Sequence, residues 1–189
     1  MPTPDRTSVD EIVQAGRDIL ESDGLARLTM QAVAERVGVR PPSLYKRVRD
    51  RDNLVGLITE ATVRDLGERL AAVDAGVDAR AALASMAQAI RAFAHSRPAG
   101  FALIFTPRAD PGRPDVETLT KAVAPVLRVA AMLAGEEHAL EAARTVTAWA
   151  YGFLSMELAG AFNLGGDVDR AYEFGISRLT NALAARRPS

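Results

Sequence analysis

The chain has no cysteine, only two histidines and few aromatic residues. The absence of cysteine excludes disulfide bonds, thiolate catalysis and cysteine-ligated metal sites. His95 and His138 stand far apart in the sequence, and neither belongs to an HExxH spacing, so a metal site is not indicated. A GxSxG motif and a glycine-rich phosphate-binding loop are also missing. We therefore expect no enzyme activity, no cofactor and no bound metal.

Long apolar runs are lacking as well. No window approaches the roughly eighteen uninterrupted apolar residues that a membrane-spanning helix needs. The first residues, MPTPDRTS, do not show the basic and then apolar pattern of a signal peptide. These two observations predict a cytoplasmic protein that has no membrane partner.

Strand signals are nearly absent, whereas alanine-rich helical periodicity runs through almost the whole sequence. With 189 residues and 48% apolar content, the chain can bury one sizeable core or two smaller ones. We predict an all-α protein of about nine helices. The expected helices cover about 8–23, 29–37, 41–48, 51–73, 79–96, 98–105, 115–134, 136–163 and 168–186, with a link at 74–78 and a proline-rich loop at 106–114.

The segment 29–54 has the pattern of two short helices joined by a tight turn. Thr29 stands where its hydroxyl can cap the first helix, and Gly38 follows that helix at the position that favours a left-handed turn. Leu44 and Val48 lie four residues apart, as on the inner face of a second helix. The apolar residues of the first helix have the spacing of a buried stripe: Met30, Val33, Ala34 and Val37. The outward residues of the second helix are mostly polar or basic: Arg40, Ser43, Tyr45, Lys46 and Arg47. This layout predicts a helix-turn-helix whose second helix enters a DNA major groove.

The local charge agrees with this interpretation, although the net charge of the chain is only −1. Residues 36–51 contain six basic residues and one acidic residue. A basic patch on a near-neutral protein suits a protein that distinguishes one DNA sequence from others. Charge alone would equally fit a solvated surface of an arginine-rich protein, so the hypothesis depends on the helix–glycine–helix spacing.

These residues also resemble the N-terminal DNA-binding domain of the TetR/AcrR family of bacterial one-component regulators. The resemblance runs from about Val9 to Leu66 and comprises matches in a fixed order. They are a first helix, SVDEIVQAGRDILESDG, an LARLT link, a T-x-x-x-V-A spacing, a Gly-Val turn, a Leu-Tyr pair and the helix opening RDRDNL. The resemblance implies a helix-turn-helix domain at 1–50 and an effector-binding and dimerisation domain at 51–189.

The resemblance also implies DNA contacts for individual residues. Thr29, Tyr45 and Arg51 would hold backbone phosphate, while Lys46 and Arg47 would meet phosphate or base. The tip that faces the groove would consist of Pro41, Pro42 and Ser43. Independently of the resemblance, residues 1–7 have the composition of an unstructured arm, in which Arg6 could add a further phosphate contact.

The start of the second helix departs from the family pattern. Arg40 occupies the position where the family usually has a small polar cap, and Pro41 and Pro42 follow it. The two prolines are tolerated because amides of a first helical turn need no partner within the helix. They nevertheless remove two donors for phosphate, and Arg40 could compensate by binding phosphate or the O6 and N7 atoms of guanine.

Small residues form a stripe in the segment 141–162 that would let two helices approach closely. These residues are Ala148, Gly152, Ser155 and Ala159, and the bulkier residues beside them are Phe162, Ile176, Leu179 and Leu183. We expect them to form a homodimer interface, a four-helix bundle about a twofold axis. Packing of the same faces within one chain is the alternative. A twofold dimer would require an operator that is an inverted repeat, with recognition helices about 34 Å apart.

An apolar effector pocket is expected in the C-terminal part. Its candidate lining residues are Met86, Ile90, Phe93, Phe101, Phe105, Met132 and Trp149, although residues of these kinds are also ordinary core. Polar groups that could orient a ligand are His95, Arg91, Thr145, Tyr151 and Glu157. The resemblance implies a repressor that binds a palindromic operator as a homodimer and is released by a small hydrophobic effector.

Two alternatives remain open at this point. The chain could be a helical ligand-binding or partner-binding protein whose basic patch does not read DNA, which salt-sensitive and sequence-specific duplex binding would reject. It could also be a structural dimer without a pocket, which would show no thermal shift with any hydrophobic ligand.

Overall fold

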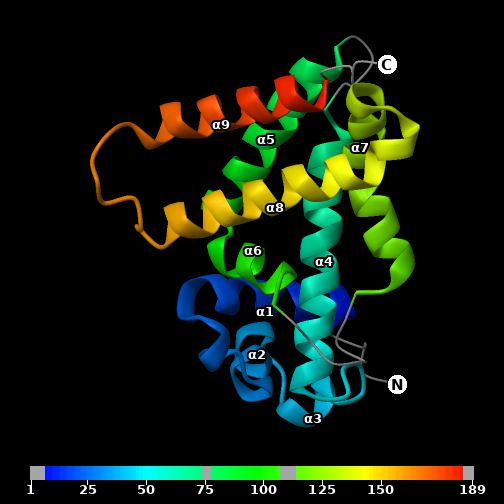
Figure 1. Ribbon diagram of the computed structural model, residues 1–189. Helices are drawn as coiled ribbons and strands as arrows, with labels where there is room; N and C mark the ends of the chain where they lie inside the picture. The colour runs from blue at the N-terminus through cyan, green and yellow to red at the C-terminus, as the bar shows by residue number, and fades with distance from the viewer. Residues whose placement is uncertain (1–6, 74–77, 107–113, 185–189) are drawn as a thin grey trace. The chain divides into compact units, whose positions relative to one another are not determined.

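The computed structural model describes residues 7–73, 78–106 and 114–184, and within these ranges every regular element is helical (Figure 1). The all-α prediction is therefore confirmed. Arg6 and nearly all of the expected link at 74–78 and loop at 106–114 lie outside the described residues. The α-helices are α1 (Val9–Asp23), α2 (Met30–Val37), α3 (Pro41–Leu44), α4 (Arg51–Ala71), α5 (Ala79–Ser96), α6 (Pro98–Ile104), α7 (Val116–Ala134), α8 (Ala139–Leu158) and α9 (Val168–Leu183). Two 3-10 turns, η1 (Leu25–Arg27) and η2 (Glu136–His138), complete the set.

The chain divides into two compact units. Unit 1 consists of residues 1–64 and 97–119, and unit 2 of residues 65–96 and 120–189. Helix α4 contributes its first part to unit 1 and its end to unit 2, and α6 belongs to unit 1 although α5 and α7 flank it in the sequence. The expected domains 1–50 and 51–189 were defined by function, whereas these two units are defined by packing. The functional division at residue 50 therefore stays a prediction.

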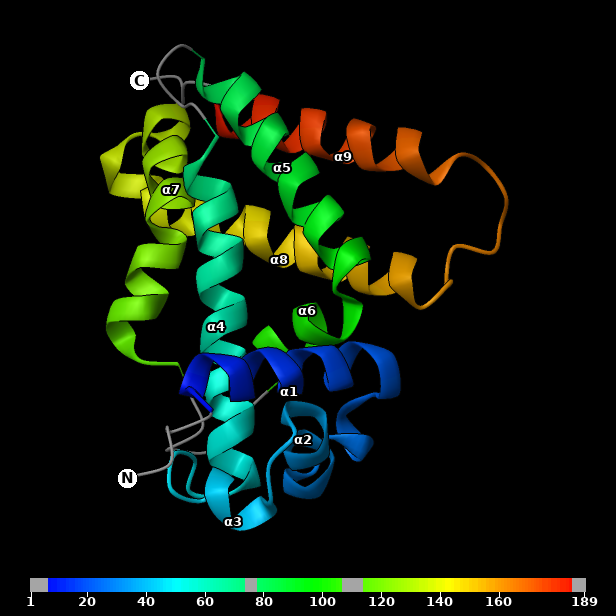
Figure 2. The ribbon, with the colours of Figure 1, turned by 180° about the vertical axis from the view of Figure 1, so that it is seen from behind.

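Unit 1 includes the start of α4 because that helix supplies part of its core. Leu54, Val55 and Ile58 are essentially fully buried and pack with apolar side chains of α1, α2 and α3. Figure 2 shows α1 crossing the N-terminal half of α4. Leu103 of α6 joins the same core, so this short helix is held by side chains that precede it by forty residues or more.

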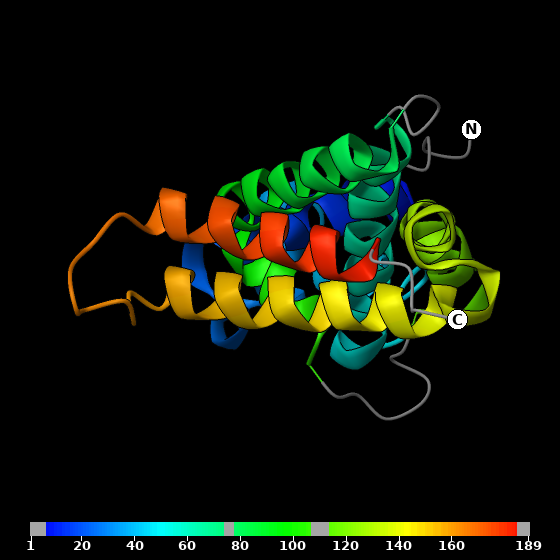
Figure 3. The same ribbon diagram turned by 45° about the horizontal axis from the view of Figure 1, so that its top comes forward.

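Unit 2 contains α5, α8 and α9, and Figure 3 shows α8 and α9 lying side by side in opposite directions. Helix α8 is shorter than the predicted segment 136–163. It begins at Ala139, after the η2 turn, and ends at Leu158. The C-terminal end of α8 is marked by two hydrogen bonds outside the regular helical pattern. The N–H of Gly160 donates to the Glu157 carbonyl, and that of Ala161 donates to the Met156 carbonyl. The following residues up to Asp167 form an exposed connection to α9.

Candidate functional site

The turn between α2 and α3 has the predicted local geometry. The Thr29 hydroxyl accepts a hydrogen bond from the Ala32 amide at 3.1 Å, so Thr29 is the N-cap of α2. Gly38 closes the helix in the left-handed region, with φ of 74°. A side chain at this position would strain the backbone, so glycine is the residue that suits the turn best.

Helix α3 is a single turn rather than the predicted 41–48. Arg40 occupies its N-cap without making a capping side-chain hydrogen bond, and prolines fill its first two positions. The first turn of the helix therefore has no side-chain cap, and regular helical structure stops at Leu44. The following residues still turn in the same sense, because the Val48 amide donates to the Leu44 carbonyl at 2.8 Å. Leu44 and Val48 are consequently both fully buried, as the spacing predicted.

Polar and basic side chains cover the outside of this segment. Arg40, Ser43, Lys46 and Arg47 are exposed, and Tyr45 keeps 54% of its surface accessible. Pro42 is exposed and Pro41 is half-buried. The residues between 40 and 47 that were predicted to contact DNA thus lie together on one accessible segment. Leu44 and Val48 are buried beneath it.

Arg51 differs from the other predicted DNA contacts. Its Nε donates to the Leu28 carbonyl and its Nη2 to the Leu25 carbonyl, each at 2.7 Å. These partners lie before α2, so the guanidinium connects the start of α4 with the segment that leads into α2. The sequence offered no local signal for these bonds, since their partners are 23 and 26 residues away.

Asp50 is a cap that sequence reasoning counted only as an isolated acid. Its carboxylate accepts the Asn53 amide hydrogen bond at 2.7 Å, directly before α4 begins, and pairs with Arg49 at 2.8 Å. The Asn53 amide and the Arg49 guanidinium lower the pKa of Asp50 below its ordinary value of 3.8. The D-x-x-N spacing before an apolar run was the signal that could have identified this cap.

Glu21, on α1, caps a second helix of unit 1. Its carboxylate accepts hydrogen bonds from the amides of Ala99, at 3.1 Å, and Gly100, at 2.8 Å, which belong to the first turn of α6. A carboxylate at this end of a helix satisfies free amides and interacts favourably with the helix dipole. Glu21 therefore fixes α6 to α1.

A small cavity lies inside unit 2. Its volume is about 40 Å³, and it is lined by Leu70, Leu83, Met86, Ala87, Ile90, Val126, Val146, Thr147 and Ala150. Met86 and Ile90 are thus the predicted pocket residues that the structure brings together around this cavity. A second and more open hollow of about 580 Å³ lies between α5 and α9, with Arg80, Ser85, Gln88 and Glu173 among its lining residues.

The other predicted pocket residues lie elsewhere. Phe101 and Phe105 belong to unit 1, where their rings meet edge to face at 5.5 Å. Phe93 is fully buried in unit 2, and Met132 is 53% exposed on α7. Trp149 packs on the rings of Tyr172 and Phe153, at 5.2 and 5.5 Å between centroids, so it belongs to an aromatic cluster of α8 and α9.

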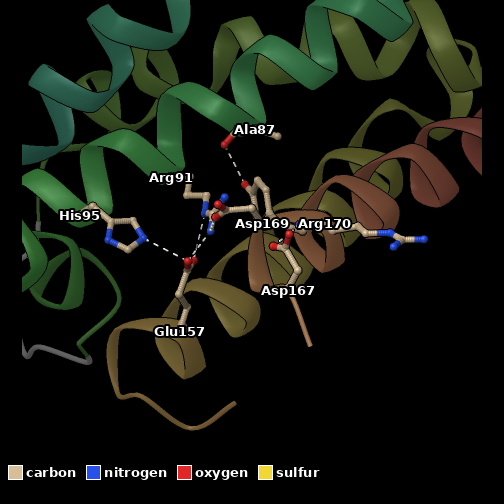
Figure 4. Close-up of polar contacts among 8 residues, drawn as sticks. Ala87, Arg91, His95, Glu157, Asp167, Asp169 and Arg170 are labelled. Atoms are coloured by element: carbon tan, nitrogen blue, oxygen red, sulfur yellow. Dashed lines mark hydrogen bonds and ion pairs between the residues drawn. The ribbon is translucent and has the colours of Figure 1, made fainter. Parts of the chain in front are cut away.

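Arg91, Glu157 and His95, expected to orient a ligand, instead interact with one another (Figure 4). Arg91 of α5 forms ion pairs with Glu157 of α8 and with Asp169 of α9, and its guanidinium lies 5.0 Å from the centre of the Tyr172 ring. His95 Nε2 lies 3.3 Å from the Glu157 carboxylate. This group of residues, the Arg91 cluster, therefore connects α5, α8 and α9.

The electrostatics of the Arg91 cluster follow from its burial and pairing. Hydrogen bonding to Glu157 raises the pKa of Arg91, and the same contact lowers the pKa of Glu157 below its ordinary value of 4.5. Burial raises the pKa of Tyr172 to about 12, and the Tyr172 hydroxyl donates a hydrogen bond to the Ala87 carbonyl at 2.7 Å. Arg91 and Glu157 thus both remain charged, and each charge is balanced by the other inside unit 2.

The residues predicted to form the dimer interface divide into two groups. Ala148, Gly152, Ala159 and Phe162 are exposed, whereas Ser155, Leu179 and Leu183 are half-buried. Ile176 is only 5% exposed and packs inside the protomer. Met156 of α8 and Phe174 of α9, which the sequence interpretation did not select, add large exposed apolar side chains to these helices.

The part of the chain that the structure describes contains neither a membrane-spanning helix nor a metal-binding group of side chains. No described helix is long and apolar enough to cross a membrane. The described residues also contain no group of three or more histidine and carboxylate side chains that could hold a metal ion.

The capped α2, the left-handed turn and the exposed basic segment over a buried face define a helix-turn-helix regulator that binds DNA. Comparison with known families agrees with this class. Residues 12–57 match the family described as bacterial regulatory proteins, tetR family, and residues 83–179 match the tetracyclin repressor-like, C-terminal domain. The second match alone covers more than half of the chain, which therefore belongs to the TetR family of transcriptional regulators.

Similar proteins and structures cover nearly the whole chain. The uncharacterized HTH-type transcriptional regulator Rv0681 of Mycobacterium tuberculosis is 28% identical over 185 residues, which cover 97% of this chain and 84% of that protein. The structure of BioQ with its natural double-stranded DNA operator has a TM-score of 0.71 and 24% identity, covering 95% of this chain and 99% of that one. A TetR variant from Acinetobacter baumannii AYE in complex with minocycline has a TM-score of 0.71 and 22% identity, covering 93% and 96% of the two chains. At this identity the two structures establish the shared fold.

Proposed function

We propose that the chain is a homodimeric repressor that binds an inverted-repeat operator through α2 and α3 and leaves it when a small apolar effector binds unit 2. The observation that carries the DNA-reading part is the segment 40–48, called the reading segment below, whose outer side chains from 40 to 47 are exposed. Its inner residues Leu44 and Val48 are fully buried, so the orientation of its outer side chains is set by the core of unit 1.

The proposed contacts have two roles. Thr29, at the capped start of α2, and Tyr45 hold phosphate and set the register on the duplex. Arg40, Lys46 and Arg47 supply cations that meet phosphate or base edges, and Ser43 with Pro41 and Pro42 forms the tip that enters the groove. BioQ, which shares the fold, was solved with its double-stranded DNA operator, and this supports binding of an operator by the present chain.

The two lysines of the chain provide a matched test of the reading segment. Duplexes selected by the wild-type protein from a randomised library serve as probes. Lys46→Ala should lower operator affinity, and the slope of log affinity against log salt should fall by about one if Lys46 meets phosphate. Lys121→Ala, an exposed exchange on α7, should leave both quantities unchanged. Equal effects of the two exchanges would reject the proposed role of this segment.

Exposed apolar residues on α8, in the connection after it and on α9 support the dimer. Ala148 and Gly152 allow a second helix to approach closely, while Phe162 and Met156 offer apolar surface that a partner would remove from water. A second copy of the chain is the proposed occupant. Its two reading segments would then meet major-groove faces about 34 Å apart.

Gly152→Arg tests this face at a position where an added Cβ atom would meet no atom within 4 Å. The variant should sediment as a monomer and lose most of its operator affinity, because one reading segment alone makes half of the contacts. Ala81→Arg, on the exposed side of α5, is the matched control and should remain dimeric. A dimeric Gly152→Arg protein would show that the copies meet through another surface.

The cavity beside Met86 and Ile90 is the proposed effector site. Its volume of about 40 Å³ is far below the roughly 300 Å³ or more of typical ligand sites, so a ligand must push its helices apart. Such a ligand binds the expanded conformation more tightly, and that difference is what can lower DNA affinity. The minocycline complex of the TetR variant with this fold supports a ligand-responsive unit, although it does not identify the ligand here.

A panel of small apolar compounds, screened by thermal shift and by release of the selected duplex, tests the effector site. Val146→Ile adds one methylene to the cavity wall and should reduce the shift given by any active compound. Val129→Ile, at a buried position that does not line the cavity, is the control. A compound whose effect is unchanged by Val146→Ile binds elsewhere.

A further inference from the structure

The start of α4 carries a cation whose surroundings differ from those of the exposed basic segment. Arg51 is half-buried, and two of its N–H groups already donate to main-chain carbonyls of residues 25 and 28 at 2.7 Å. A guanidinium presents its donors as a rigid planar fork, which suits two carbonyl oxygens held at fixed positions. The side chain is therefore oriented by the protein before any DNA is present.

The two carbonyls belong to a short helical end. Leu25 opens the η1 turn and its carbonyl already accepts the Leu28 amide at 3.3 Å, while Leu28 follows the last residue of the turn. Arg51 therefore adds a second hydrogen bond to the Leu25 carbonyl and one to the Leu28 carbonyl. A cation at such an end is stabilising. Leu28 also directly precedes Thr29, the N-cap of α2. The fork of Arg51 thus fixes the point at which α2 begins.

The same side chain fixes the other end of the reading segment. Arg51 is the first residue of α4, and the turn, α3 and the basic residues lie between α2 and α4 in the chain. Helix α3 has four residues and no capping side-chain bond, so it cannot hold its own orientation in water. Its direction depends on Leu44 and Val48 inside the core and on the positions of the two flanking helix starts.

We propose that Arg51 is a positioning residue, which clamps the start of α2 to the start of α4 so that the segment between them faces DNA in one orientation. Its contribution to operator binding comes from the bidentate contact to the carbonyls of Leu25 and Leu28 and not from charge on a phosphate. This inference rests on the proposed operator binding, and it assigns Arg51 a role different from that of Lys46 and Arg47.

A charge-conserving exchange separates the two roles. Lysine at this position keeps the positive charge but cannot bridge two carbonyls with a planar fork. Arg51→Lys and Arg51→Gln should therefore both lose about tenfold or more in affinity for the selected operator duplex. Arg128→Lys, the same exchange at an exposed position of α7 outside the basic patch, is the matched control and should bind like the wild type. Circular dichroism confirms that each variant is folded at the temperature of the assay.

Salt dependence and hydrogen exchange complete the test. For Arg51→Lys, the salt slope of the remaining binding should stay close to that of the wild type, and amides of residues 28–33 should exchange faster in the DNA-free protein. Wild-type affinity of Arg51→Lys together with a slope lowered by about one in Arg51→Gln would overturn the proposal in favour of a phosphate contact. Unchanged exchange at residues 28–33 would overturn the clamp itself.

Failure of the proposed operator binding and failure of the Arg51 clamp would give different results. If the wild-type protein selects no duplex from the library, operator binding fails and the positioning role for DNA fails with it. The hydrogen-exchange comparison of Arg51→Lys with the wild type still decides, without DNA, whether the side chain clamps the two helix starts.

Discussion

The two compact units of this chain use similar helices for different kinds of packing. Unit 1 has a core of large aliphatic side chains, and its polar groups are used at helix ends, as Thr29, Asp50 and Glu21 illustrate. Both hollows described above lie in unit 2, as does the Arg91 cluster, and unit 2 also exposes apolar side chains on α8 and α9. The first unit is built to hold a short surface segment in one orientation. The second retains internal space and uncovered apolar surface, which pairing with another copy and binding of a ligand would use.

We expect the largest loss of stability from a cavity created in the core of unit 1. Leu44→Ala removes a fully buried side chain from beneath the reading segment. We expect a loss of about 3–4 kcal/mol in the free energy of unfolding, from lost apolar burial and the cavity left behind. Urea denaturation at fixed protein concentration measures this loss, and operator affinity should fall with it. A loss below about 1 kcal/mol would mean that the segment packs loosely on the core.

The Arg91 cluster provides the corresponding test of unit 2. Arg91→Met removes the main partner of the nearly buried Glu157 carboxylate and should cost about 3 kcal/mol at neutral pH. Because Arg91 lowers the pKa of Glu157, the stabilisation is complete above the ordinary value of 4.5 and disappears as pH falls through the lowered value. The difference in unfolding free energy between wild type and variant should therefore shrink in acid. A difference independent of pH down to the acid limit of folding would contradict the assigned pairing, and Arg91→Met combined with Glu157→Gln should recover part of the loss.

The next largest loss of stability is expected where α4 and α7 approach closely in unit 2. A methyl group on Gly67 of α4 would lie 2.7 Å from the main-chain Cα of Ala122 in α7, a contact that only a backbone shift can relieve. Gly67→Ala should thus destabilise by about 1–2 kcal/mol, despite the better helix propensity of alanine. Gly152→Ala is the control, since a methyl group there meets no atom within 4 Å, and it should not destabilise the protomer. Stabilisation by Gly67→Ala would show that α4 and α7 can separate without cost.

The smallest effect concerns the assignment of α6 to unit 1. Glu21→Gln keeps the shape of the side chain but removes the charge that caps α6, which should cost about 1 kcal/mol. Hydrogen exchange should increase in residues 98–104 much more than in α5. Equal increases along α5 and α6 would indicate that α6 unfolds with unit 2 and would weaken the division between the units.

Sequence reasoning was most accurate where the signal is local. The cap at Thr29, the turn at Gly38 and the buried pair Leu44 and Val48 each depend on residues within a few positions, and the structure confirms all of them. The length of α3 was overestimated because the inner spacing continues to Val48, although the regular helix ends at Leu44 and the residues after it form turns. The end of α8 was misplaced for a related reason, since helical periodicity does not report where amides begin to turn back.

The sequence by itself determined the helical class, the order of the helices and the turn with its buried and exposed positions up to Val48, because hydrophobic periodicity and capping act over one or two turns. Tertiary structure alone decided which distant groups meet. The partners of Arg51, Glu21 and Arg91 lie between 23 and 79 residues away in the chain. A charged side chain in a sequence indicates only what it can bind. Which carbonyl, amide or carboxylate satisfies it depends on how the helices pack, because desolvated polar groups must find partners within the folded unit.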